Sequence, residues 1–110
     1  MNRNPPPMSR EAAEAALERA LAISRELVSA AESGAVEDVL RLDAERLGLL
    51  KSVRHALQPM SDKNRSAIRA IAELNARSIG QMEHRFRAKC RDLDMLAAGR
   101  RAVRAYAHHR

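Results

Sequence analysis

The chain has 110 residues and carries 20 Lys and Arg against 14 Asp and Glu, which gives a formal net charge of +6. This length predicts a single domain with a modest core. Phe86 and Tyr106 are its only residues of the Phe, Trp and Tyr types, which argues against a stacking platform for single-stranded nucleic acid. Its one cysteine, Cys90, excludes an internal disulfide and fits a reducing compartment.

The positive charge is concentrated at one end. Residues 1–84 contain twelve basic and twelve acidic side chains, whereas residues 85–110 contain eight basic side chains and two acidic ones, Asp92 and Asp94. The chain therefore combines a neutral body with a basic last quarter. It contains no run of about 18 apolar residues, so the sequence predicts no membrane insertion.

Ala, Leu, Arg and Glu dominate the composition, and they predict an all-α fold. Residues 1–8 are rich in proline and lack the apolar core of a signal peptide, so we expect a disordered leader there. A helical domain is expected over residues 9–98, followed by a basic C-terminal helix or tail over residues 99–110.

The first helix is expected to start after Ser9, which is a favourable N-cap residue, and to end at Gly34, which can adopt a positive φ. Glu11 lies in its first turn, where the helix dipole favours an acidic side chain. The apolar stripe of this helix recurs at intervals of three and four residues. Its members are Ala13, Leu17, Ala20, Leu21, Ser24, Leu27, Val28 and Ala31.

The second helix is expected to run from Val36 to about Leu57, because Pro59 prevents its continuation. Its main stripe consists of Val36, Val39, Leu40, Leu47, Leu50, Val53 and Leu57. Leu42 and Leu49 lie outside that stripe, so the apolar face is wider than one neighbouring helix needs. Since only a tight turn fits between the first two helices, they should form an antiparallel hairpin.

The third helix is expected to begin at Ser61 or Asp62. If it continues to Ala107, it has about 45 residues and a length of roughly 68 Å, which is twice the length of the second helix. Its stripe consists of Ile68, Ile71, Asn75, Ile79, Met82, Phe86, Cys90, Leu93, Ala97, Arg100 and Val103. The hairpin can therefore cover only half of it. Either the C-terminal part stands free, or the helix breaks at Gly80 or within residues 97–99. We expect the break, with the last segment folded back as a short fourth helix in a three-helix bundle-like arrangement.

The sequence indicates no active site. The histidines, at positions 55, 84, 108 and 109, are scattered, and Cys90 has no nearby cysteine partner, whereas a zinc site needs three or four converging ligands. No serine or cysteine has a placed base, and acidic pairs such as Glu37 and Asp38 fall in the first turn of a helix, where the dipole accounts for them. We therefore expect no metal, no cofactor and no enzymatic activity.

Three polar residues interrupt the apolar stripes. Asn75, at the centre of the third stripe, is either a partly hydrated position at a helix–helix edge or a buried residue that fixes register or hydrogen-bonds a facing backbone. Asp43 and Arg54 on the second helix admit the same two interpretations, and a solvated edge is favoured for both.

The basic end has three interpretations. It could bind nucleic acid through phosphates, meet an acidic protein surface, or be a solvated helix terminus whose cations complement the dipole. The charge is modest, two acids interrupt it, and no recognition helix of a turn motif is visible. A protein partner is therefore favoured over nucleic acid.

Two segments resemble the FliT-type flagellar export chaperones. The first, ALAISRELVSAAESGAVEDVLRLDAERLGLLKSV, has the leucine-rich helix, the glycine turn and the leucine–arginine–leucine rhythm of that family. The rhythm consists here of Leu42, Arg46, Leu49 and Leu50. The second, LNARSIGQMEHRFRAKCRDLDMLAAGRRAVRAY, has the third-helix asparagine, Asn75, and a closing basic segment with an Ala-Tyr pair. The likeness extends over about residues 10–107.

The resemblance implies a cytoplasmic chaperone of the flagellar type III export system that holds the filament-cap protein before secretion. It further implies contacts with the export ATPase apparatus and with the flagellar master transcription activator, and so a regulation of flagellar gene expression. In that family the C-terminal helix can fold over the client-binding surface. This assigns Val103 and Tyr106 to a mask and leaves the neighbouring arginines for other partners. These arginines are Arg100, Arg101 and Arg104.

A groove between the second and third helices is expected to bind an amphipathic helix of the client, without chemistry. The expected partner-binding residues are Leu42, Leu49, Ile71, Leu74, Met82 and Phe86. Each of them would otherwise be an ordinary core residue of three packed helices. Leu49 and Leu74 lie off the main stripes and are therefore the preferred candidates.

Three other functions remain open. A chaperone for hook–filament junction proteins shares the long helical hairpin. A small basic nucleic-acid-binding or regulatory protein would use the basic end, although direct nucleic-acid binding is not the expected role. A structural coiled-coil homodimer would cover the apolar half-stripe of the third helix, which otherwise needs its own tail or a client as a cover.

Overall fold

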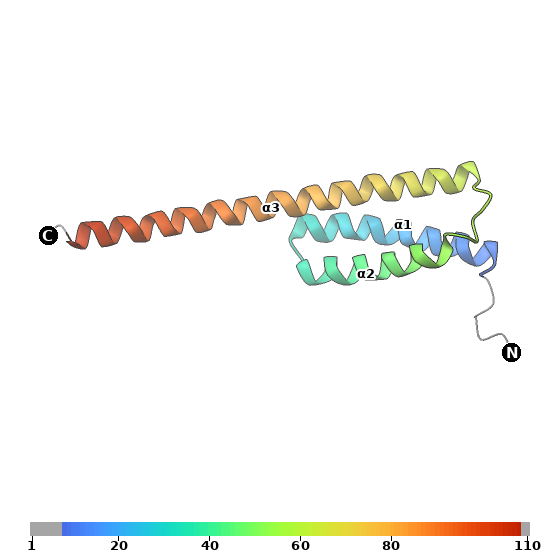
Figure 1. The fold of residues 1–110 in the computed structure, drawn as a ribbon, viewed down its shortest axis with the longest axis horizontal. Helices are drawn as coiled ribbons and strands as arrows, with labels where there is room; N and C mark the ends of the chain where they lie inside the picture. Colours follow the sequence, from blue (N-terminus) through green and yellow to red (C-terminus); the bar gives the residue numbers. More distant parts are fainter. Residues whose placement is uncertain (1–7, 109–110) are drawn as a thin grey trace.

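The computed structural model describes residues 8–108, which form three α-helices (Figure 1). They are α1 (Arg10–Ser33), α2 (Val36–Val53) and α3 (Asp62–His108). The predicted all-α class is confirmed, and no strand occurs in this part of the chain. The predicted leader falls, apart from exposed Met8, outside the described residues, as do the last two residues of the basic tail.

Both ends of α1 have the predicted caps. The N–H of Ala12 donates to Oγ of Ser9 over 3.1 Å, so one of the free donors at the start of the helix is satisfied. Gly34 has a φ of 74°, and the N–H of Ala35 donates to the carbonyl of Ala30 over 2.9 Å. A left-handed residue at this position reverses the chain, and α2 returns antiparallel to α1.

The first helix is the centre of the fold, because α1 packs against both α2 and α3, whereas α2 and α3 do not come comparably close to one another within residues 8–108. Figure 1 shows α1 between the other two helices. Its buried stripe contributes to two apolar clusters. The first contains Ala13, Leu17, Ala20, Val53, Leu57 and Ile71, and the second contains Ile23, Leu27 and Leu42. The first cluster therefore joins residues of all three helices, whereas the second lies between α1 and α2.

The second helix differs from its prediction in length and in orientation. It ends at Val53, and residues 54–57 form a turn that carries Leu57 into the cluster of Leu17 and Val53, where it is 1 % exposed. The face that packs on α1 contains Leu42 and Arg46 together with Val53. Three residues of the predicted main stripe, Val36, Leu40 and Leu47, are exposed instead, because one neighbouring helix covers only one side of α2.

The expected break in the third helix is wrong. Ser61 caps α3, as predicted, by accepting the N–H of Asn64 at Oγ over 3.2 Å. From Asp62 the helix then continues through Gly80 and Gly99, so the described chain contains no fourth helix. A helical glycine costs about 1 kcal/mol, which the good helix formers around it offset. The first half of α3 packs on α1, while the second half stands clear of the other helices and gives the molecule a length of 81 Å.

Within residues 8–108, none of the helices combines the length and the apolar character that a membrane crossing requires.

Candidate functional site: an apolar groove between α2 and α3

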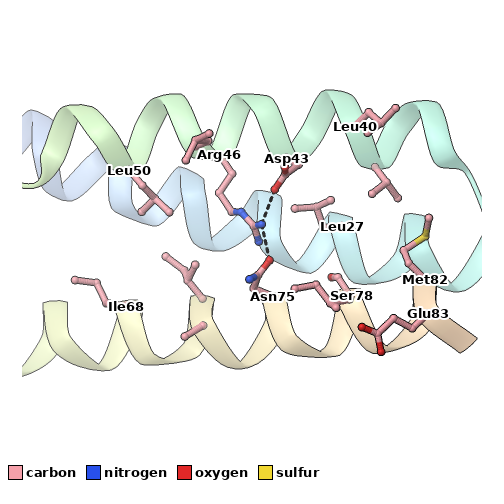
Figure 2. Close-up of a pocket in the computed structure, with 15 residues that line it drawn as sticks. Leu27, Leu40, Asp43, Arg46, Leu50, Ile68, Asn75, Ser78, Met82 and Glu83 are labelled. Atoms are coloured by element: carbon pink, nitrogen blue, oxygen red, sulfur yellow. Dashed lines mark hydrogen bonds and ion pairs between the residues drawn. The ribbon is translucent and has the colours of Figure 1, made fainter.

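A groove of about 740 Å³ lies between α2 and α3, where neither helix covers the other (Figure 2). It follows directly from the packing, since both helices lean on α1 and leave their facing sides apart. α2 lines it with Val39, Leu40, Asp43, Arg46, Leu47 and Leu50. α3 lines it with Ile68, Ile71, Ala72, Asn75, Ser78, Ile79, Met82 and Glu83, and α1 adds Leu27.

The walls of the groove are apolar and open to solvent. On the α2 side, Leu40 is 66 % exposed and Leu47 is 52 % exposed. On the α3 side, Ile79 is 50 % exposed and Ile68 is 40 % exposed. Large aliphatic side chains that are half exposed on two facing helices form a contiguous apolar surface, and exposed apolar surfaces of this kind are typical of interaction sites.

A polar cluster crosses the groove at its centre. Arg46 extends from α2 toward α3, and its Nη2 donates to Oδ1 of Asn75 over 2.7 Å and to Oδ1 of Asp43 over 2.8 Å (Figure 2). Its Nη1 donates to Oγ of Ser24 on α1 over 3.4 Å, and that hydroxyl in turn donates to the carbonyl of Ala20. One guanidinium thus joins all three helices.

The burial of this arginine explains why it needs so many partners. Arg46 is 7 % exposed, and a buried charge is stable only when it is paired and hydrogen-bonded. The Asp43 carboxylate supplies the counter-charge while remaining 58 % exposed itself. Because the bond between Arg46 and Asn75 links α2 to α3 directly, the cluster fixes the distance between the two walls of the groove.

Sequence reasoning found part of this cluster. Asn75 is half-buried and bonded, but its partner is an arginine side chain rather than a facing backbone. Asp43 and Arg54 are exposed, as the favoured interpretation of both required. Arg46 was missed as a structural residue. The available signal was its position four residues after Leu42, three before Leu49 and seven before Val53, in line with the buried face of α2.

The predicted partner-binding residues are only partly brought together. Ile71 and Met82 line the groove, although Ile71 is 5 % exposed and belongs also to the core. Leu42 is buried in the core and Leu49 packs against it, so neither lines the groove. The two remaining residues are not at the groove either. Leu74 is half-buried outside it, and Phe86 is 71 % exposed on α3 beyond its end.

The groove residues that the prediction omitted belong to the stripes it described. Leu40, Leu47 and Leu50 were assigned to the main stripe of the second helix, and Ile68 and Ile79 to that of the third. The excess width of the apolar face on α2 was the signal for an apolar surface that α1 leaves uncovered. The prediction placed Leu42 and Leu49 at the groove and assigned Leu40, Leu47 and Leu50 to the main packing stripe, whereas the structure has the first two at the core and the last three at the groove. The sequence alone does not say which side of α2 is covered by α1.

At the turn between α1 and α2, an arginine fastens α3 to α1. Nε of Arg85 donates to the carbonyl of Ala31 over 3.0 Å, and its Nη2 donates to the carbonyl of Glu32. These carbonyls belong to the last turn of α1, where backbone acceptors lack helical partners and the dipole favours a cation. Arg77 adds an ion pair to Glu32 over 3.7 Å. Beyond Arg85 the third helix leaves the body.

The predicted mask does not cover the groove in this structure. Val103 is 69 % exposed and Tyr106 is 74 % exposed, and both lie on the part of α3 that extends away from α1 and α2. Arg100, Arg101 and Arg104 are exposed on the same part. A masking role would need a different arrangement of α3 and stays a prediction.

Over the described residues, no group of three His, Cys, Asp or Glu side chains is arranged to hold a metal ion. Comparisons with protein-family models, with curated proteins and with solved structures give no match.

Proposed function

We propose that this protein binds an amphipathic helix of a client protein in the groove between α2 and α3 and acts as its chaperone. The observation that carries the proposal is the open apolar surface formed by Leu40, Leu47 and Ile79 on two helices that do not pack on each other. A client helix laid between α2 and α3 would complete a bundle of four helices with α1, and it would bury both walls of the groove at once.

The dimensions and chemistry of the groove define its occupant. The lining residues of α3 run from Ile68 to Glu83, a distance of about 22 Å at 1.5 Å per residue, which corresponds to roughly four helical turns. The bound face should be apolar at both ends. At its centre it should carry one side chain that can both donate and accept, such as an amide, since Arg46 and Asp43 face that position.

The resemblance to FliT-type chaperones suggests which client this is. On that resemblance, the occupant is a terminal helix of the flagellar filament-cap protein, held in the cytoplasm before type III export. The exposed basic half of α3 is then available for the export ATPase apparatus and for the flagellar master transcription activator. A hook–filament junction protein is the alternative client of the same groove.

The test is a binding titration of the full chain with labelled peptides that cover the terminal segments of the filament-cap and junction proteins. Leu47→Glu and Ile79→Glu place a charge on each wall and should raise the dissociation constant at least about tenfold. Leu93→Glu is the matched control, because Leu93 is 64 % exposed on α3 but does not line the groove.

Three outcomes decide the proposal. Filament-cap binding that only the two groove variants weaken supports both the groove and the client. Junction-protein binding with the same variant pattern supports the groove and corrects the client. Binding that Leu93→Glu weakens equally, or binding only to nucleic acid with a steep loss on added salt, would reject the groove as the functional site.

A further inference from the structure

The free half of α3 carries a second apolar face, separate from the groove. Its members recur at intervals of three and four residues and are Asp92, Met95, Leu96, Gly99, Val103 and Tyr106, here called the Gly99 face. Met95 and Tyr106 are 73 % and 74 % exposed. Gly99 follows Ile79 by twenty residues, and at about 100° per residue it lies roughly 200° around the helix from the groove wall.

No neighbouring atom of the isolated chain requires a glycine at the centre of this face. A Cβ built on Gly99 would meet nothing within 4 Å, and an interior helical glycine costs about 1 kcal/mol relative to alanine. Gly48 and Gly80 are equally open, but their neighbours at three and four residues are small or polar. Around Gly99 those positions are apolar, and Met95, Leu96 and Val103 form a shallow hollow with it, which Arg100 and Arg104 also line. A second helix could approach closely at this point.

We propose that the Gly99 face pairs with the same face of a second copy, antiparallel and centred on Gly99. Two pairs of this face lie symmetrically about that residue: Met95 and Val103 each lie four residues from it, and Asp92 and Tyr106 each lie seven residues from it. Leu96, three residues before Gly99, has Ala102 as its counterpart. In the pair, Met95 packs on Val103 of the second copy. The hydroxyl of Tyr106 donates to the carboxylate of Asp92 of the second copy, twice by symmetry.

The shape of the molecule permits this arrangement. The body formed by α1 and α2 lies against the first half of α3, so an antiparallel pairing near the C-terminal end places the two bodies at opposite ends. Both grooves stay open, since they lie on the other side of α3. The paired segment is short, which predicts a weak and concentration-dependent dimer. Arg100 flanks the seam near its symmetry mate, so added salt should strengthen the pairing by screening.

The test uses disulfide cross-linking in a Cys90→Ser background. Asp92→Cys and Tyr106→Cys are prepared separately and then mixed. In the antiparallel pair these two positions face each other, so the mixture should form a cross-linked dimer under mild oxidation. Each variant alone should not, because two copies of position 92 lie about 21 Å apart along the axis, far beyond the reach of a disulfide.

A second variant tests the contact at the centre. Gly99→Leu fills the point of close approach and should raise the dimer dissociation constant at least about tenfold in sedimentation equilibrium, while helicity is kept or increased. Arg101→Leu, on the opposite side of α3, is the control and should not weaken the dimer. If either variant alone forms a cross-linked dimer, two copies of the same position face each other, which would indicate parallel rather than antiparallel pairing. A monomeric mass at high salt and high concentration, with no cross-link in the mixture, would overturn the proposal.

Discussion

At the scale of single residues, Arg46 is the one charged residue that is buried among residues 8–108. It exchanges hydration for bonds to Asn75, Asp43 and Ser24, and hydrogen bonds to a charged group contribute about 1.5–3 kcal/mol. Its buried aliphatic stem adds packing. We therefore expect Arg46→Ala to lower the free energy of unfolding by about 2–3 kcal/mol, measured by urea denaturation.

The matched control is Arg41→Ala. Arg41 also pairs with an aspartate on the same helix, Asp38, over 3.5 Å, but its side chain is 64 % exposed. Such exposed pairs contribute less than about 1 kcal/mol, so this variant should unfold close to the parent midpoint. Equal losses in Arg41→Ala and Arg46→Ala would show that the cluster at the groove contributes no more than a surface ion pair.

Two glycines should respond to the same substitution with opposite signs. Gly34 has a φ of 74°, and a Cβ there would lie 2.8 Å from Nη1 of Arg85, so Gly34→Ala strains the backbone and displaces the side chain that fastens α3. We expect a loss of about 1–2 kcal/mol. Gly80→Ala lies within a helix with no atom in its way, and should gain about 0.5–1 kcal/mol. Thermal unfolding of both variants distinguishes these effects, and a gain at Gly34 would contradict the capping role of that turn.

At the scale of elements, the second half of α3 is a helix without tertiary support. An unsupported helix opens locally with little free energy, whereas α1 is buried along its whole apolar stripe and opens with the protein. In hydrogen exchange at low micromolar concentration, amides of residues 92–104 should exchange at least about a hundredfold faster than those of residues 17–27. Uniform protection along α3 would show that another surface already covers it.

The ends of the helices could be predicted from neighbouring residues in the sequence. The way the helices pack on one another could not. Ser9, Gly34 and Ser61 act through neighbours three to five residues away, so their roles are legible in the sequence. The orientation of α2 depends on which side of it α1 covers, and the apolar pattern of α2 fits either choice. Leu49 was therefore placed at the groove and Leu47 was not, whereas Leu47 lines the groove and Leu49 packs against the core.

The continuity of α3 illustrates the same limit. A glycine inside a helix favours a break, and an exposed apolar face favours a segment that packs on it. A break at residues 97–99, with the last segment folded back, satisfied both expectations. The structure instead keeps the helix straight and leaves its distal face exposed. Whether that face finds a partner depends on contacts between chains, which a helix propensity or a single-chain pattern does not encode.

At the scale of the whole molecule, the extended third helix makes shape the most direct observable. A compact chain of this length has a radius of gyration of about 13 Å, whereas the Cα value here is 22.1 Å, with extents of 81 × 36 × 18 Å. Small-angle X-ray scattering extrapolated to zero concentration should give a value close to 22 Å. A chain that ends at Ala88 should fall toward the compact value, because it lacks the free half of α3.

The concentration series in the same experiment separates three arrangements of that helix. A radius near the compact value in the full chain would mean that the distal segment folds back, as a mask over the groove requires. A radius that stays high and constant would mean an isolated extended helix. The pairing of two Gly99 faces predicts a third result, because bodies at opposite ends of an antiparallel pair must increase the radius as dimer accumulates. That increase should grow with salt, since the paired segments are both basic, and it should be absent in Gly99→Leu.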